Sequence, residues 1–127
     1  MKALIVDDSR GMRLILKKFL ASEGFDVLHE AGDGAEALER LKEVGKVDLA
    51  LVDWNMPRMN GLEFIVAVRK DAALSGMRGM MVTTEAEVSQ ISRALDAGAN
   101  EYVMKPFTSE VLRDKLGILG FSDGTHA

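Results

Sequence analysis

The feature that most constrains the fold of this chain is the alternation of short apolar runs with amphipathic segments. Runs such as Leu-Ala-Leu-Val at 49–52 lack polar alternation and end in charged or turn residues, which favours parallel strands buried on both faces. We expect strands at 3–6, 25–30, 49–52, 80–83 and 101–104, the second being more polar and suited to a sheet edge. Strands that alternate with helices form a parallel sheet with right-handed crossovers. The sequence therefore predicts an α/β protein with a (βα)5, doubly wound, five-stranded sheet.

The segments between these strands have helical periodicity. Helices are expected at 10–22, 35–44, 62–70, 86–97 and 109–119, with Ser9 as the N-cap of the first. Apolar residues that recur at i, i+3, i+4 and i+7 mark the side of a helix that packs on the sheet. Two such sets are expected to be buried: Met12, Ile15, Leu16 and Phe19 in the first helix, and Val88, Ile91 and Leu95 in the fourth. Residues 120–127 are expected to form a frayed tail.

Length and composition limit the classes of function. A chain of 127 residues is expected to form one domain over 1–127. Its net charge of −4 gives no support for nucleic-acid binding, and the absence of cysteine excludes disulfides and thiol nucleophiles. No apolar run approaches the roughly 20 residues that span a bilayer, and the N-terminus lacks the pattern of a signal peptide. We therefore expect a cytoplasmic protein without membrane insertion.

Polar residues follow four of the five expected strands. Asp7 and Asp8 follow the first, Asp53 follows the third, Thr83 ends the fourth and Lys105 follows the fifth. The carboxyl ends of parallel strands lie at one edge of the sheet, where open α/β proteins bind their ligands. The topology therefore predicts that these five side chains gather at one site.

The chemistry of that set is specific. Carboxylates crowded together cannot all stay ionised without a cation, and two or three aspartates without His or Cys suit Mg²⁺. A lysine and a hydroxyl beside them suit phosphoryl transfer onto Asp53, which needs mainly positioning and charge neutralisation. The alternative for each residue alone is ordinary: Asp7 and Asp8 would cap a helix, and Lys105 would be a surface lysine.

Four sequence blocks identify a resemblance. LIVDDS at 4–9, LVDWNMPRMNGLEF at 51–64, MVTTEAE at 81–87 and DAGANEYVMKPF at 96–107 together resemble a response-regulator receiver domain, most closely the single-domain chemotaxis members of that family. The blocks cover nearly the whole chain in order. The resemblance implies a flavodoxin-like sheet with strand order 2-1-3-4-5.

The resemblance also assigns roles at the acidic cluster. Asp53 would be the phosphoacceptor, and a sensor histidine kinase would be the phosphodonor. Asp8, Asp53 and the backbone carbonyl of Asn55 would ligate Mg²⁺, and Asp7 would act on the ion through a water molecule.

A second group of roles concerns the switch. Thr83 and Lys105 would hold the acyl phosphate, and Lys105–Pro106 would be a cis peptide. Phosphorylation would draw Thr83 toward the phosphoryl group, and Tyr102 would rotate inward. The face formed by the fourth helix, fifth strand and fifth helix would then bind a downstream target protein.

Two further positions would tune the lifetime of the acyl phosphate. Asn55 and Glu85 lie two residues beyond Asp53 and Thr83, and polar residues at both resemble the short-lived signals of chemotaxis. A phosphatase is a possible further partner. Thr84 departs from the family, which usually has Ala or Gly there. Its β-branched side chain would either crowd the entry of the phosphoryl group or add a hydroxyl contact, and would thereby change the rate of phosphotransfer and of phosphorylation by small donors.

Several interpretations of the function remain open at this stage. The leading one is a stand-alone, monomeric switch controlled by phosphorylation. A phosphorelay intermediate or phosphate sink, and a receiver excised from a larger regulator, are alternatives. A turnover enzyme would need a second acid–base residue beside Asp53, and the sequence offers no good candidate, so we expect a phosphoacceptor that is not an enzyme on an external substrate.

Overall fold

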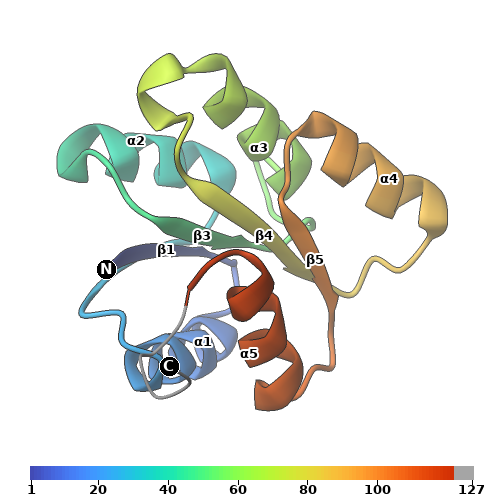
Figure 1. Ribbon diagram of the computed structural model, residues 1–127. Coiled ribbons are helices and arrows are strands. Elements are labelled where there is room, and N and C mark those ends of the chain that lie inside the picture. The colour runs from blue at the N-terminus through green and yellow to red at the C-terminus, as the bar shows by residue number, and fades with distance from the viewer. Residues whose placement is uncertain (122–127) are drawn as a thin grey trace.

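Five parallel strands form the centre of the computed structural model, which describes residues 1–121 (Figure 1). The strands follow the order β2-β1-β3-β4-β5, so the predicted fold class is confirmed. Strands β3 and β5 have the predicted bounds, and β1 and β4 start slightly earlier. The strands are β1 (Lys2–Val6), β2 (Val27–Ala31), β3 (Leu49–Val52), β4 (Arg78–Thr83) and β5 (Glu101–Met104).

Helices cover both faces of this sheet. Figure 1 shows α1 and α5 on one face and α2, α3 and α4 on the other, and the buried side chains divide into two apolar clusters in the same way. The residues of β3 alternate between the two clusters and are all buried, which is why this strand is uniformly apolar. The helices are α1 (Arg10–Ser22), α2 (Gly34–Val44), α3 (Gly61–Lys70), α4 (Val88–Ala97) and α5 (Ser109–Ile118), with a 3₁₀ turn at Ala72–Leu74.

Side-chain caps define where four of these helices begin. Ser9, Asp33, Asn60 and Thr108 each accept a hydrogen bond from a backbone N–H in the first turn of α1, α2, α3 and α5, respectively. Helix α4 differs, because Glu87 precedes it without a side-chain cap hydrogen bond. Among residues 1–121, α4 is therefore the one α-helix that begins without a side-chain cap.

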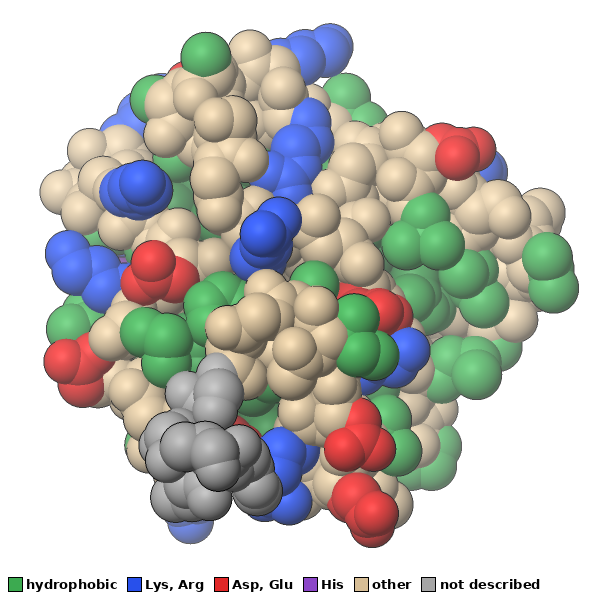
Figure 2. Space-filling view, in the orientation of Figure 1, with side chains coloured by type: hydrophobic (Ala, Val, Ile, Leu, Met, Phe, Trp, Pro, Cys, Tyr) green, Lys and Arg blue, Asp and Glu red, His purple; other side chains and the backbone are tan. Residues whose placement is uncertain are grey.

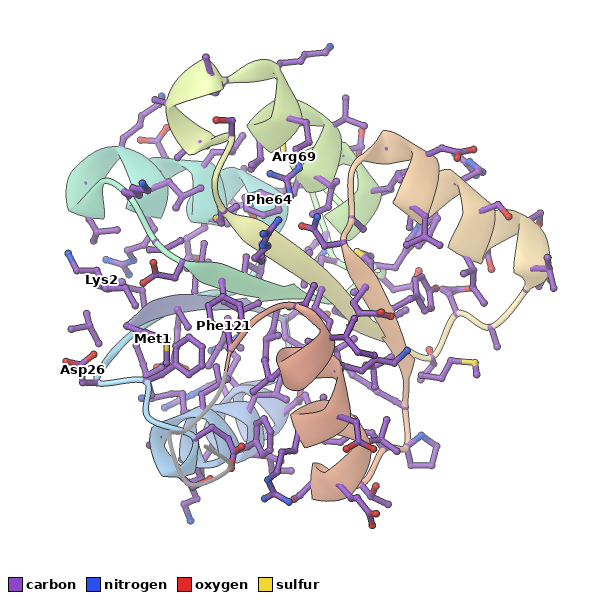
Figure 3. All side chains as sticks on the ribbon, in the orientation of Figure 1. Met1, Lys2, Asp26, Phe64, Arg69 and Phe121 are labelled. Carbon is purple, nitrogen blue, oxygen red and sulfur yellow. The ribbon has the colours of Figure 1, made fainter. Side chains whose placement is uncertain are left out.

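The chain at the other end of α4 is hydrogen-bonded to α3 and β4. Arg69 of α3 donates from Nε to the Gly98 carbonyl at 3.0 Å and from Nη2 to Asn100 Oδ1 at 2.8 Å (Figure 3). The same Asn100 oxygen accepts the Gly79 N–H at 2.8 Å. These bonds hold the C-terminal end of α4, so any displacement of this helix is easiest at its uncapped start.

Two predicted helix faces were wrong in part. Val88 and Leu95 of α4 are 79% and 45% exposed, and the buried residue of this helix is Ala94. Ile15 of α1 is 53% exposed, whereas Leu20 is fully buried. Helix α4 lies over β5, which is an edge strand of the sheet. A helix at the edge of the sheet packs against neighbouring elements along only a narrow strip of its surface, so some of its apolar side chains stay exposed to solvent.

The predicted bounds also failed at α4, which begins at Val88 and not at residue 86, and at two further chain segments. The second strand begins at Val27, and Phe25 lies before it as a buried residue of the core. Phe121 belongs to the predicted tail, yet its ring packs on Phe25 with 5.4 Å between the centroids (Figure 3). The tail prediction for 122–127 lies outside the described residues.

Candidate functional site

An acidic cluster lies at the carboxyl edge of the sheet. Val6 of β1 pairs in register with Val52 of β3, and Asp53 N–H donates to the Val6 carbonyl at 2.9 Å. The residues that follow these strands are therefore neighbours. Carboxylate oxygens of Asp7, Asp8 and Asp53 lie within 4.8 Å of one another, with Asp7 and Asp53 buried and Asp8 exposed.

These three carboxylates fit a small divalent cation. Mg²⁺ binds oxygen at about 2.1 Å, so oxygens on opposite sides of one ion are about 4 Å apart. The three carboxylate oxygens all lie within 4.8 Å of one another, so small side-chain movements bring them within reach of one ion, and the set contains oxygen donors only. One exposed member leaves room for the water molecules that Mg²⁺ retains. The donor set therefore suits Mg²⁺ better than zinc.

Lys105 provides the positive charge at this cluster. Its Nζ lies 2.8 Å from Asp7 Oδ2 and 3.3 Å from Asp53 Oδ2. Burial lowers the pKa of Lys105, but the hydrogen bond with Asp7 and the charge of Asp53 outweigh burial, so its pKa lies above the ordinary value. The ammonium group is therefore charged at neutral pH. The Lys105–Pro106 peptide bond is cis.

Thr83 lies on the neighbouring strand end. Its side chain is fully buried, and its Oγ accepts the Glu85 N–H at 3.4 Å. Its carbonyl accepts the Lys105 N–H at 2.8 Å, which joins the ends of β4 and β5. Thr84 is exposed at the rim.

A chain of hydrogen bonds runs from the Asp53 loop to β5. Asn55 Nδ2 donates to Glu85 Oε1 at 2.6 Å, and the Tyr102 hydroxyl donates to the Glu85 carbonyl at 2.6 Å. Tyr102 is only 9% exposed, so its ring lies inward. Burial, followed by the negative charges of Glu85 and Asp53, raises the pKa of Tyr102. Glu85 thus connects Asn55, to which the resemblance assigned a role in phosphoryl lifetime, with Tyr102, to which it assigned a role in switching.

Sequence reasoning missed other residues at the margin of the site. Arg13 of α1 donates to the Asp7 carbonyl and, at 3.1 Å, to Glu30 Oε1. The guanidinium of Arg93 on α4 lies 5.8 Å from the ring centre of Trp54, a cation–π contact beside Asp53. Trp54 itself is a buried packing residue. No local pattern signals either arginine, because each contact joins segments that are distant in sequence or separated by a turn.

The start of α3 packs directly on the phosphoacceptor candidate. The Gly61 N–H donates to the Trp54 carbonyl at 2.9 Å. A Cβ at Gly61 would lie 2.0 Å from the Asp53 carbonyl oxygen. Only glycine permits this approach, so Gly61 helps to set where the backbone of Asp53 lies.

An exposed apolar surface lies on α4, β5 and α5. Val88, Leu95, Met104 and Val111 are 79%, 45%, 50% and 42% exposed, respectively. Figure 2 shows apolar side chains gathered on the right-hand side of the molecule, over α4 and beside α5. Exposed apolar groups that gather in this way typically mark a protein-binding surface. This is the face expected to bind a target.

Fold and site together define a class: doubly wound α/β proteins with an acidic crevice and a paired lysine at the carboxyl edge of the sheet. The family model described as "Response regulator receiver domain" matches residues 3–117. The chain belongs to the family of response-regulator receiver domains. Within residues 1–121, no helix is long and apolar enough to cross a membrane.

Individual relatives agree with this assignment. The chain is 43% identical over 124 residues to chemotaxis protein CheY1 of Helicobacter pylori, covering 97% of this chain and 100% of that protein. It is 47% identical over 116 residues to chemotaxis protein CheY of Pseudomonas aeruginosa, covering 91% and 93%, respectively.

Solved structures show the same fold. CheY4 of Vibrio cholerae matches with a TM-score of 0.84 and 33% identity, covering 93% of this chain and 97% of that one. A chain in the CheX-CheY-BeF3-Mg²⁺ complex of Borrelia burgdorferi matches with a TM-score of 0.85 and 26% identity, covering 94% and 89%.

Proposed function

We propose that this protein is a chemotaxis-type response regulator that accepts a phosphoryl group on Asp53 and thereby switches a protein-binding face. The observation that carries the proposal is the cluster of Asp7, Asp8 and Asp53 within 4.8 Å, with the Lys105 ammonium beside it. This set combines a nucleophile, a place for a metal ion and a fixed positive charge at one end of the sheet. The protein would act as a phosphoacceptor and not as an enzyme that turns over an external substrate.

The phosphodonor is a phosphohistidine of a sensor kinase. A carboxylate oxygen of Asp53 attacks the phosphorus, a P–O bond forms and the P–N bond to the histidine breaks. The released imidazole takes a proton from solvent. Such a transfer depends on positioning and on neutralisation of the phosphoryl oxygens, which the surroundings of Asp53 supply.

The residues suited to hold Mg²⁺ are Asp8, Asp53 and the Asn55 carbonyl, with Asp7 acting through water. When bound, the ion would neutralise charge on the transferring phosphoryl oxygens. Lys105 keeps its charge because two carboxylates raise its pKa, so it can pair with one phosphoryl oxygen after transfer. Thr83 offers a hydroxyl donor from the adjacent strand end.

The output of the switch is the α4–β5–α5 face. Tyr102 connects to the site through Glu85, whose carbonyl accepts the Tyr102 hydroxyl hydrogen bond. Movement of the Thr83–Glu85 segment toward a phosphoryl group would change this bond, and α4 begins directly after that segment without a side-chain cap. The exposed Val88 and Leu95 of α4 would move with it. A downstream target protein would bind this surface in the phosphorylated state.

The chemotaxis assignment is supported by the relatives. Proteins named for chemotaxis match over nearly their whole length, which favours a single receiver domain spanning residues 1–127. The Borrelia complex contains CheX and Mg²⁺ with its CheY chain, which supports Mg²⁺ as the cofactor and a CheX-like protein as a partner class. Polar Asn55 and Glu85 favour a short-lived signal.

The test is incubation of the wild-type protein with Mg²⁺ and acetyl phosphate, followed by intact mass measurement. We expect one phosphoryl group on the wild-type protein and none on Asp53→Asn. The Asp8→Asn variant should need more Mg²⁺ for the same modification. Phosphorylation of Asp53→Asn to the wild-type level would overturn the assignment of the acceptor.

The switch needs a separate test. Binding of a cognate target is compared for the wild-type protein, Tyr102→Ala and Tyr102→Phe, each with and without phosphoryl group. Tyr102→Phe keeps the ring but removes the hydrogen bond to Glu85. We expect both variants to be phosphorylated, with a smaller phosphorylation-dependent gain in target affinity. An unchanged gain in Tyr102→Ala would refute the role of this residue.

A further inference from the structure

The loop that follows Asp53 is fastened to the start of α2 by a set of contacts around Asp33 and Arg58. We propose that Asp33 and Arg58 form a positioning pair that holds residues 54–60 in the shape needed for Mg²⁺ binding at the Asn55 carbonyl. This inference rests on the proposed function, because it assumes a metal at the acidic cluster. Neither residue would touch the ion.

Asp33 is a buried carboxylate with two partners. Its Oδ1 caps α2 by accepting the Glu36 N–H at 2.9 Å, and its Oδ2 accepts Arg58 Nε at 2.9 Å, with Nη2 also in contact. Burial opposes ionisation of Asp33, but the bonds from Glu36 N–H and Arg58 outweigh burial and lower its pKa. The carboxylate is therefore charged, and Arg58 is the cation in contact with it among residues 1–121. The Asp33 side chain is 4% exposed and the Arg58 side chain is 69% exposed, so solvent screens the arginine end and the charge-assisted hydrogen bonds at the buried carboxylate hold the pair together.

The backbone at Arg58 has an uncommon conformation. Its φ is +63°, and it is the only non-glycine residue with positive φ within residues 1–121. The Met59 N–H donates to the Pro57 carbonyl at 2.7 Å, which closes a three-residue turn around Arg58. Tight turns of this hand are rare for residues with a side chain and need support from their surroundings. The ion pair with Asp33 supplies such support.

A backbone contact beside the ion pair adds a second attachment. The Gly34 N–H, at the first residue of α2, donates to the Met59 carbonyl at 2.9 Å. A Cβ at Gly34 would lie 2.7 Å from Met59 Cγ and 2.9 Å from the Met59 carbonyl oxygen. The loop thus lies against the helix start so closely that no side chain fits between them.

The contacts around Asp33 and Arg58 matter because Asn55 itself makes few hydrogen bonds to the rest of the protein. Asp53 is held by β1, and Gly61 is held by the Trp54 carbonyl. Between them, the exposed Asn55 is joined to the rest of the protein by its side-chain bond to Glu85. The position of its backbone carbonyl therefore depends on how the following turn is held, three residues later at Arg58.

For substitutions of Arg58, electrostatics alone predicts the opposite effect on Mg²⁺ affinity, which makes the inference testable. Removing a positive charge near a cation site should strengthen Mg²⁺ binding, whereas loss of positioning should weaken it. Residues that orient metal ligands typically change metal affinity by 10- to 100-fold when mutated. We expect Arg58→Gly, which tolerates positive φ, to raise the Mg²⁺ dissociation constant about 10-fold. Asp33→Asn keeps a helix cap but loses the charge, and should also weaken Mg²⁺ binding. Loss of a negative charge acts in that direction as well, so Arg58→Gly is the variant that separates positioning from electrostatics.

The experiment is a Mg²⁺ titration followed by fluorescence of Trp54, the single tryptophan of the chain. Amide exchange of Gly34 in metal-free protein is measured in parallel and should accelerate in both variants. Arg78→Gln removes one positive charge from the opposite end of β4 and serves as the control with an unchanged dissociation constant. Arg58→Lys should recover part of the affinity.

The outcomes separate the two claims. Weaker Mg²⁺ binding in Arg58→Gly and Asp33→Asn, with Arg78→Gln at the wild-type value, supports the positioning pair. Equal or tighter binding in Arg58→Gly, whatever the result for Asp33→Asn, with wild-type protein that does bind Mg²⁺, overturns the inference and leaves the proposed function intact. A wild-type protein that binds no Mg²⁺ overturns the proposed function and the inference together.

Discussion

Gly61→Ala is expected to destabilise the protein by displacing the backbone of Asp53. The added Cβ would lie 2.0 Å from the Asp53 carbonyl oxygen and 2.9 Å from its carbonyl carbon. Non-bonded heavy atoms prefer separations of about 3.5 Å or more. Because both obstructing atoms belong to the backbone, no side-chain rotation relieves the overlap, and α3 or the end of β3 must move by more than an ångström.

The size of this effect follows from the rigidity of the two elements. Overpacking in a well-packed region costs about 1–3 kcal/mol, and the backbone overlap places Gly61→Ala at the upper end. The higher helix propensity of Ala offsets up to about 1 kcal/mol. We therefore expect a net loss of about 2 kcal/mol in the free energy of unfolding, which lowers the melting temperature by roughly 5–10 °C in a domain of this size.

Urea unfolding followed by circular dichroism measures this loss. Gly117→Ala in α5 is the matched control, because its Cβ would meet no atom within 4 Å, and it should stabilise the protein by up to about 1 kcal/mol. The two substitutions are chemically identical and should have opposite signs. If Gly61→Ala were as stable as the wild-type protein, the close approach of α3 to Asp53 would be refuted.

Three further results are expected. Lys105→Met leaves two buried carboxylates without their cation, so urea unfolding without Mg²⁺ should show that the free energy of unfolding falls by roughly 2–3 kcal/mol. Added Mg²⁺ should restore part of this loss. A loss that Mg²⁺ does not change would count against a site shared by the lysine and the ion. Phenolate absorbance of Tyr102, the single tyrosine, should titrate above the usual pKa of about 10 because burial, Glu85 and Asp53 raise its pKa. The folded state then holds this proton more tightly than the unfolded state, so stability should fall as pH rises past about 10; a midpoint at or below 10 would contradict the burial of this ring. The acyl phosphate should decay within minutes because Asn55 and Glu85 are polar, and phosphate-release kinetics showing a lifetime of hours would contradict this.

The strands were predictable because buried parallel strands leave a strong apolar signal, whereas their order in the sheet was predicted from the family resemblance. Strand β3 ends at Val52, as its sequence indicates, and Asp53 follows it at the sheet edge. Helix α4 was harder, since periodicity identifies an apolar face but not whether another element covers it. Val88 and Leu95 have helical spacing but lie at the margin of the sheet, where α4 has few neighbours.

The acidic cluster was predictable from topology, because strand ends determine where Asp7 and Asp53 lie. The links between loops were not. The bond from Asn55 to Glu85 joins residues 30 positions apart, and the turn at Arg58 depends on a contact with Asp33. Such contacts depend on loop conformation and side-chain rotamers, for which hydrophobic periodicity carries no information.

The central claim is that strand ends bring a nucleophilic carboxylate to a site where a metal ion and a lysine assist phosphoryl transfer. Its most direct test is to map the modified residue after treatment with acetyl phosphate and reduction with borohydride, which converts an aspartyl phosphate to homoserine. Peptide mass analysis should find homoserine at position 53 in samples that contain Mg²⁺ and only unmodified aspartate there in samples with a chelator. Modification at another residue, or equal modification of Asp53 without Mg²⁺, would contradict the account.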